Sequence, residues 1–213
     1  YGLIAIILTL IIISGEIDLS IASMIALTAV IFGTVYNAGF GMPASVLIAV
    51  LAGSLCGLFN GILVTKLKIP SIILTIGTLT LYRGIAQSLA SDFSLGGYPS
   101  WFIGIDYRYV GIVPIPVIIF TVFAIVVGFI LSSTIYGKQL FLIGTNPVTA
   151  KYSGIKVDRI KLLLFTLSGL ISGVAGVLTT SRLAVARFNM ATGAELEIVL
   201  MVMLGGTYIF GGR

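Results

Sequence analysis

This chain of 213 residues contains no histidine, one cysteine and only 9% charged residues. Without histidine, a histidine-ligated metal centre and histidine-based acid–base chemistry are both excluded. Cys56 stands alone in an apolar segment, so the chain has no internal disulfide and no thiolate metal site. The patterns GxxxxGK[ST], GxSxG and HExxH are also missing. The sequence therefore predicts a protein that is not an enzyme, binds no metal and hydrolyses no nucleotide.

Apolar residues are abundant instead, at 58% of the chain, with a mean hydropathy of +1.19. So few charges cannot cover a soluble protein, and we predict an all-α fold, a polytopic transmembrane helix bundle with broken or re-entrant segments. Residues 1–213 are expected to form a single transmembrane domain. The chain begins inside an apolar run without Met and stops at Gly-Gly-Arg, so we expect a fragment with both ends missing.

Apolar stretches recur along the chain, and a spanning helix needs about 20 residues. They cover residues 2–14, 21–36, 44–65, 71–90, 111–132, 162–181 and 198–210. The third to the sixth are long enough to span a bilayer. The first, the second and the last are short, and we expect them to be clipped or to be half-helices that break inside the membrane.

Lysine and arginine predict the orientation. Every lysine lies in 65–70 or 137–161, so both segments are expected to be cytoplasmic, and the net charge of +5 needs no nucleic-acid partner. The loop 91–110 is then extracytoplasmic, and its aromatic residues are expected to form an interfacial belt; these are Tyr98, Trp101, Phe102, Tyr107 and Tyr109. We interpret Arg83 as snorkelling to the outer headgroups, with a polar exit patch alongside Gln87 as the alternative.

The segment 137–161 is a basic, turn-rich loop between two spans. Asn146 followed by Pro147 predicts the start of a short helix, and Gly154 predicts its left-handed stop. A short capped helix on the cytoplasmic side is a place where a soluble partner could push, which indicates a membrane subunit driven by another polypeptide.

Polar residues and a glycine pair interrupt the apolar sequence at three places. Glu16 and Asp18 lie between two apolar runs and predict a helix break, in which Asp18 or Ser20 caps the next half-helix. The alternative for Asp18 is a polar wall for a solute or ion, and the role of Glu16 stays open. Asn60 within an apolar helix predicts a bond between helices or a solute contact. Gly205 and Gly206 predict a pore-lining bend or a plain turn.

Glycine spacing predicts smooth faces on two helices. Gly53, Gly57 and Gly61 recur at i, i+4 and i+8, and Gly169 and Gly173 recur at i and i+4. Each set forms a smooth helix face, which favours tight packing in a membrane. The functional alternative is a crossing beside a translocation path.

Four segments, taken in order, resemble one family. They are similar to stretches of the permease subunits of ABC importers for monosaccharides such as ribose and xylose. The four segments are SGEIDLSIASMIALTA, GLFNGILVTKLKIPSIILTIGTLTLYRGIA, LIGTNPVTAKYSGIKVDRIKLLLFTLSGLISGVAG and GAELEIVLMVMLGGTYIFGGR. GGYPSWF is nearest to the subgroup that imports autoinducer-2 or rhamnose. Glu16 departs from the family, which usually has a second Gly there, and Ile21-Ala22 replaces Val-Gly.

The resemblance implies a bacterial inner-membrane permease that pairs with a second permease, two ATP-binding subunits and an extracytoplasmic solute-binding protein. ATP and Mg would be held by the partner subunits, and this chain would bind no cofactor. The contact with the ATPase would then comprise Gly144, Asn146, Pro147, Ala150, Lys151, Tyr152 and Gly154.

We expect a neutral, weakly binding solute path, because a many-hydroxylated sugar needs hydrogen-bonding groups and must still be able to leave. The residues expected along it are Gly15, Asp18, Ser20, Asn60, Gly205, Gly206 and Thr207. A branched-chain amino-acid ABC permease would share this topology, and an ion-driven secondary transporter would need ionisable residues in mid-helix.

Overall fold

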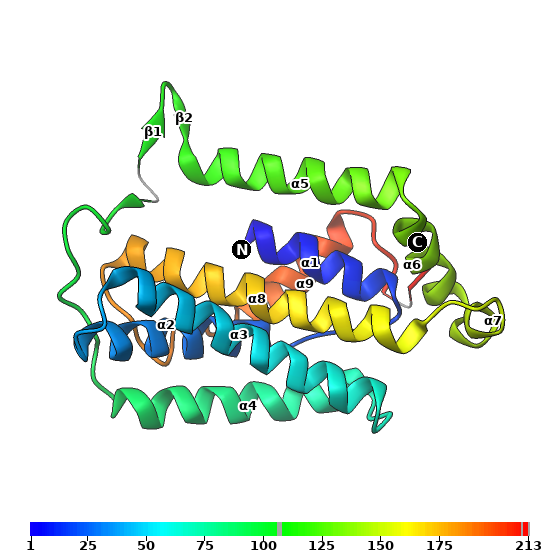
Figure 1. Ribbon diagram of the computed structural model, residues 1–213, viewed down its shortest axis with the longest axis horizontal. Helices are drawn as coiled ribbons and strands as arrows, with labels where there is room; N and C mark the ends of the chain where they lie inside the picture. Colours follow the sequence, from blue (N-terminus) through cyan, green and yellow to red (C-terminus); the bar gives the residue numbers. More distant parts are fainter. Residues whose placement is uncertain (106–107, 210, 213) are drawn as a thin grey trace.

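The computed structural model describes residues 1–105, 108–209, 211 and 212. These residues form a bundle of α-helices with one small β-hairpin, which confirms the all-α polytopic class (Figure 1). In chain order the elements are α1 (Gly2–Ile13), α2 (Ile21–Asn37), α3 (Met42–Thr65), α4 (Ser71–Ala90), β1 (Tyr109–Val110), β2 (Val113–Pro114), α5 (Ile115–Ser133), α6 (Ile135–Thr145), α7 (Pro147–Tyr152), α8 (Val157–Leu183) and α9 (Ala194–Leu204).

Within the described residues, α3, α4, α5 and α8 are long and apolar enough to cross a membrane, with 24, 20, 19 and 27 residues. They correspond to the four long apolar stretches of the sequence. α1 and α2 are shorter, as expected, with 12 and 17 residues. The last apolar stretch, 198–210, breaks as expected at its Gly205-Gly206 pair, and residue 210 lies outside the described residues. α9 begins at Ala194 and ends at Leu204, because Gly206 adopts φ +91° and the chain turns there.

The core lies around α1 and α2. Both helices are apolar on nearly all sides, and most of their side chains are buried, as is typical of central helices in a bundle. α5 lies along one side of the bundle, and Val127 is its one buried residue (Figure 1). Its remaining apolar side chains are suited to contact with lipid or with another membrane subunit.

The two predicted glycine faces meet where α3 packs against α8. A Cβ atom added to Gly57 would lie 2.9 Å from the backbone nitrogen of Gly169 and 3.0 Å from its Cα atom. A Cβ atom on Gly173 would lie 2.9 Å from the Cα atom of Val50. The two backbones therefore touch, which confirms close packing through glycine faces.

The aromatic belt expected in the loop 91–110 is wrong for two residues. Tyr98 and Phe102 are only 5% and 3% exposed, and their rings lie 5.3 and 5.2 Å from the ring of Phe32 on α2. The chain after α4 bends back over the end of α2, so these rings gain a buried apolar site. Trp101 and Tyr109 are exposed, and Tyr107 lies outside the described residues.

Snorkelling of Arg83 is also wrong. Its Nη1 atom donates to the carbonyl oxygens of Phe188 and Met190, at 2.8 and 2.7 Å. The Gln87 amide donates to Asp92 at 2.9 Å, so Gln87 and Arg83 have separate partners. The segment between α8 and α9 therefore supplies backbone acceptors for the guanidinium.

The segment 137–161 is more helical than a turn-rich loop. α6 covers Ile135–Thr145, and its Leu140 and Ile143 side chains are buried on one face. The Thr134 hydroxyl accepts from the Gly137 amide at the start of this helix. Burial of this apolar face at the end of the bundle stabilises the helix, although the composition of the segment favours a loop.

Candidate functional site

The predicted helix break lies between α1 and α2. The Gly15 and Glu16 amides donate to the carbonyls of Ile12 and Ile11, and Gly15 has φ +80°, so α1 ends in a Schellman motif. Asp18 follows with 1% of its surface exposed. Its Oδ1 atom accepts from the Ser20 amide at 3.0 Å and from the Ser20 hydroxyl at 2.6 Å. The carboxylate therefore orders the backbone where α2 begins, as predicted.

The alternative that the Ser20 hydroxyl caps α2 is wrong. Ser20 occupies the N-cap position, but its side chain accepts no bond from the helix amides. It donates to Asp18 and accepts from the Asn60 amide at 2.9 Å. The Ser20 hydroxyl is thus engaged by Asp18 and Asn60 and does not turn toward the helix amides.

Asn60 extends this network from the break to α3 and α4. Its Oδ1 atom accepts from the Tyr82 hydroxyl at 2.9 Å, and the same hydroxyl lies 3.0 Å from the Cys56 carbonyl. On the other side, the Ser168 hydroxyl on α8 donates to Asp18 Oδ2 at 2.9 Å. We call these five side chains the buried polar network; they are Asp18, Ser20, Asn60, Tyr82 and Ser168.

Three of the predicted path residues thus meet in one place. Asp18, Ser20 and Asn60 are joined by hydrogen bonds, and each is at most 1% exposed. Bonding between helices is the role that the structure confirms for Asn60. Inside the bundle, such satisfied groups are expected to hold the helices in a defined arrangement.

Tyr82 and Ser168 belong to the network but were missed in the sequence. A periodic signal was present on α4, where the buried polar residues follow helical spacing at Ser71, Thr75, Thr78 and Tyr82. Polar residues at i, i+4, i+7 and i+11 within an apolar helix indicate one face turned inward. Ser71 also acts at the break, because its hydroxyl accepts from the Ile17 amide at 3.1 Å.

Gly205, Gly206 and Thr207 lie apart from this network. Their amides bond locally to the carbonyls of α9, in a second Schellman motif. Past them, the chain returns to the helix break. The Gly212 amide donates to the Ile13 carbonyl at 3.0 Å, and a Cβ atom on Gly211 would lie 2.9 Å from the Cα atom of Gly15.

The predicted short helix is α7. Asn146 Oδ1 accepts from the amides of Val148 and Thr149, at 3.0 and 3.1 Å, which confirms the N-cap. Pro147 is the first helical residue, and Gly154, with φ +83°, ends the helix in a further Schellman motif. Tyr152 is 89% exposed and Lys151 is also exposed.

Gly144 and Ala150 face inward instead. A Cβ atom on Gly144 would lie 3.0 Å from the Cα atom of Gly212. Ala150 is 3% exposed and packs in an apolar cluster with Ile143 and Val157. Ala150 is buried and Gly144 is partly buried, and both pack against the rest of the bundle.

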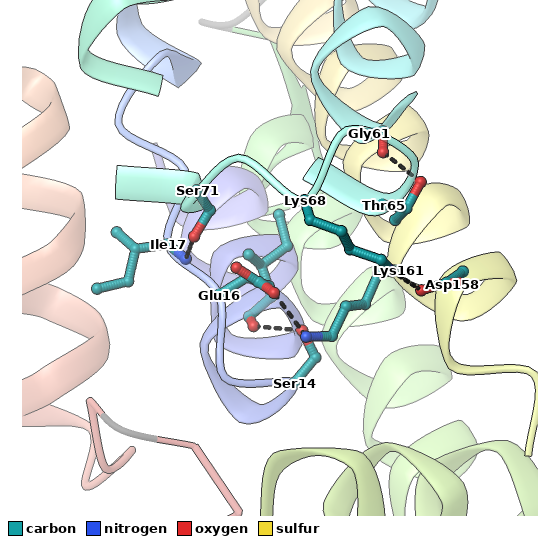
Figure 2. A network of polar contacts seen from close by, with 10 residues as sticks. Ser14, Glu16, Ile17, Gly61, Thr65, Lys68, Ser71, Asp158 and Lys161 are labelled. Atoms are coloured by element: carbon teal, nitrogen blue, oxygen red, sulfur yellow. Dashed lines mark hydrogen bonds and ion pairs between the residues drawn. The ribbon is translucent and has the colours of Figure 1, made fainter. Parts of the chain in front are cut away.

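A groove of about 730 Å³ lies between α7, the α3–α4 connector and the start of α8. Two ion pairs line it (Figure 2). Lys68 Nζ lies 2.7 Å from Asp158 Oδ1, and these side chains are 64% and 42% exposed. Lys161 Nζ lies 2.5 Å from Glu16 Oε1, and these are only 13% and 16% exposed. The two basic segments therefore meet at one end of the bundle.

Comparison with known proteins gives the family. The family model described as "Branched-chain amino acid transport system / permease component" matches residues 1–212. The chain belongs to this permease family. With its four long apolar helices, it is a multi-pass membrane protein.

Among the curated relatives is the "Autoinducer 2 import system permease protein LsrD" of Escherichia coli (strain K12), with 37% identity over 99% of this chain. The proteins of the same name from Shigella flexneri and Escherichia coli O157:H7 match equally. The chain spans 66% of the length of each of these relatives. No solved structure matches the chain.

Proposed function

We propose that this chain is the membrane-spanning part of an ABC importer permease that moves a sugar-like solute of the autoinducer-2 class across the bacterial inner membrane. The observation that carries the proposal is the 37% identity to autoinducer-2 import permeases over 99% of the chain. The ATP-binding subunits, a second permease copy or paralogue and an extracytoplasmic solute-binding protein would be its partners. ATP and Mg would then be bound by the partner subunits.

In this proposal α7 makes the contact with the ATP-binding subunit. It is short, capped at both ends and exposed at the end of the bundle (Figure 1). Tyr152 and Val148, at 89% and 61% exposure, present apolar surface beside Lys151, which suits a protein partner better than water. Gly144 and Ala150 would position the helix from beneath, and Asn146, Pro147 and Gly154 would fix its ends.

The solute path is proposed to pass the helix break. Ser20 at the break and Asn60 on α3 carry a hydroxyl and an amide, which bond to each other in this structure, and Asp18 accepts from Ser20 and Ser168. Such groups suit brief hydrogen bonds with a neutral sugar. Because Ser20 and Asn60 are buried here, solute would reach them only in a state in which α2, α3 and α8 have separated. Gly15 and Gly205–Thr207 would line the path where the helices are interrupted.

Reconstitution tests the function. The full-length protein is placed in proteoliposomes with its ATP-binding and solute-binding partners, and uptake of labelled autoinducer-2, ribose, xylose, rhamnose and leucine is measured. We expect ATP-dependent uptake of a sugar-like solute and none of leucine.

Two results would contradict the proposal. ATP-driven leucine uptake would support a branched-chain amino-acid permease, which the description of the matching family favours. Uptake that follows an ion gradient and ignores ATP would support a secondary transporter. Omitting only the ATP-binding subunits provides the matched control.

A further inference from the structure

The ion pair between Glu16 and Lys161 joins two parts of the molecule that are distant in sequence. Glu16 lies in the helix break, and Lys161 lies near the start of α8 (Figure 2). Both side chains are largely shielded from water, in contrast to the Lys68–Asp158 pair in the same groove. Salt screens a shielded pair only weakly, and removal of one partner strongly destabilises the folded protein because the other charge stays buried without a partner.

The break is held to α8 at two points. Glu16 contacts Lys161, and two residues later Asp18 contacts Ser168. Lys161 and Ser168 are related as i and i+7, so they lie on one face of α8 and are separated by roughly 10 Å along its axis. Two contacts at this spacing fix both the position and the direction of the break along α8. A movement of α8 would therefore carry the break with it.

α7 is in turn attached to the start of α8. Ala150 of α7 and Val157 of α8 are buried together with Ile143 of α6. The Ile155 amide donates to the Ala150 carbonyl at 3.1 Å, which closes the turn between the two helices. A displacement of α7 is therefore passed to the first turns of α8, where Lys161 lies.

We propose that Glu16 and Lys161 are positioning residues that transmit movement of α7 to the helix break and so to the buried polar network. This inference rests on the proposed function, because it needs a partner that moves α7. The ion pair would tie ATP hydrolysis to opening of the solute path.

The test compares solute transported per ATP hydrolysed in proteoliposomes that hold the full-length complex, with autoinducer-2 as the probe and ribose as the second. Glu16→Gln and Lys161→Met are expected to lower this ratio about fivefold or more while ATP hydrolysis continues. The charge-swapped double variant, Glu16→Lys with Lys161→Glu, should restore at least half of the ratio. Asp158→Asn, which breaks the exposed pair in the same groove, should leave the ratio unchanged.

The neutral double variant, Glu16→Gln with Lys161→Met, separates linkage from folding. A neutral pair of similar size is expected to keep the thermal stability of the wild type, because no unpaired charge remains. The transport ratio should nevertheless stay low. Wild-type ratios in both single variants, or recovery of the ratio in the neutral double variant, would overturn the inference and leave the proposed function standing. A wild-type complex that transports neither probe would overturn both.

Discussion

Replacement of Gly57 by alanine tests the α3–α8 crossing. The new Cβ atom would lie 2.9 Å from the backbone nitrogen of Gly169 and 3.0 Å from its Cα atom. Backbone atoms cannot rotate away as the end of a long side chain can, so the two helices must separate. Overpacking of this kind costs typically about 1–3 kcal/mol of the free energy of unfolding. For a chain of this size, that corresponds to a lowering of Tm by roughly 2–12 °C.

The matched control is Gly77→Ala on α4, where an added Cβ atom meets nothing within 4 Å. In a helix interior, alanine is favoured over glycine by up to about 1 kcal/mol, so this variant should be as stable as the wild type or slightly more stable. Thermal unfolding of both purified variants in detergent gives the comparison. Equal Tm values for Gly57→Ala and Gly77→Ala would refute direct backbone contact between α3 and α8.

Three further predictions concern Asn60, Gly154 and the membrane orientation. Asn60→Leu leaves the Tyr82 hydroxyl with the Cys56 carbonyl as its one partner and removes the amide that donates to Ser20. The free energy of unfolding should fall by about 1–3 kcal/mol, which lowers the Tm measured in detergent. A Tm at or above the wild-type value would contradict the buried polar network. Gly154→Val forces a β-branched residue to φ +83°, at a cost of about 1–3 kcal/mol, and should abolish solute-stimulated ATP hydrolysis while membrane insertion stays intact. The control is Gly84→Val on α4, where an added Cβ atom meets nothing within 4 Å. Normal stimulation in Gly154→Val would exclude α7 as the contact with the ATP-binding subunit. In a Cys56→Ala background, a cysteine at Ser94 should react with an impermeant thiol reagent in intact cells and one at Lys151 should not; the reverse labelling would invert the membrane orientation.

Much of the fold follows from signals that act over a few residues. Long apolar runs predict α3, α4, α5 and α8, because a bilayer requires about 20 apolar residues per span. Asn146, Pro147 and Gly154 predict α7, because caps bond to amides and carbonyls within one turn. Gly15 and Asp18 predict the break for the same reason.

Only the tertiary structure decided which side chains meet across the bundle. Glu16 pairs with Lys161 and Asp18 with Ser168, and Arg83 bonds to the carbonyls of Phe188 and Met190. These partners come from different helices, so no local pattern identifies them. A charge or hydroxyl in an apolar segment indicates that a hydrogen-bond partner lies nearby, because burial of a polar group without one costs free energy. Which partner it finds depends on how the helices cross, and that crossing is determined by the packing of all of them together.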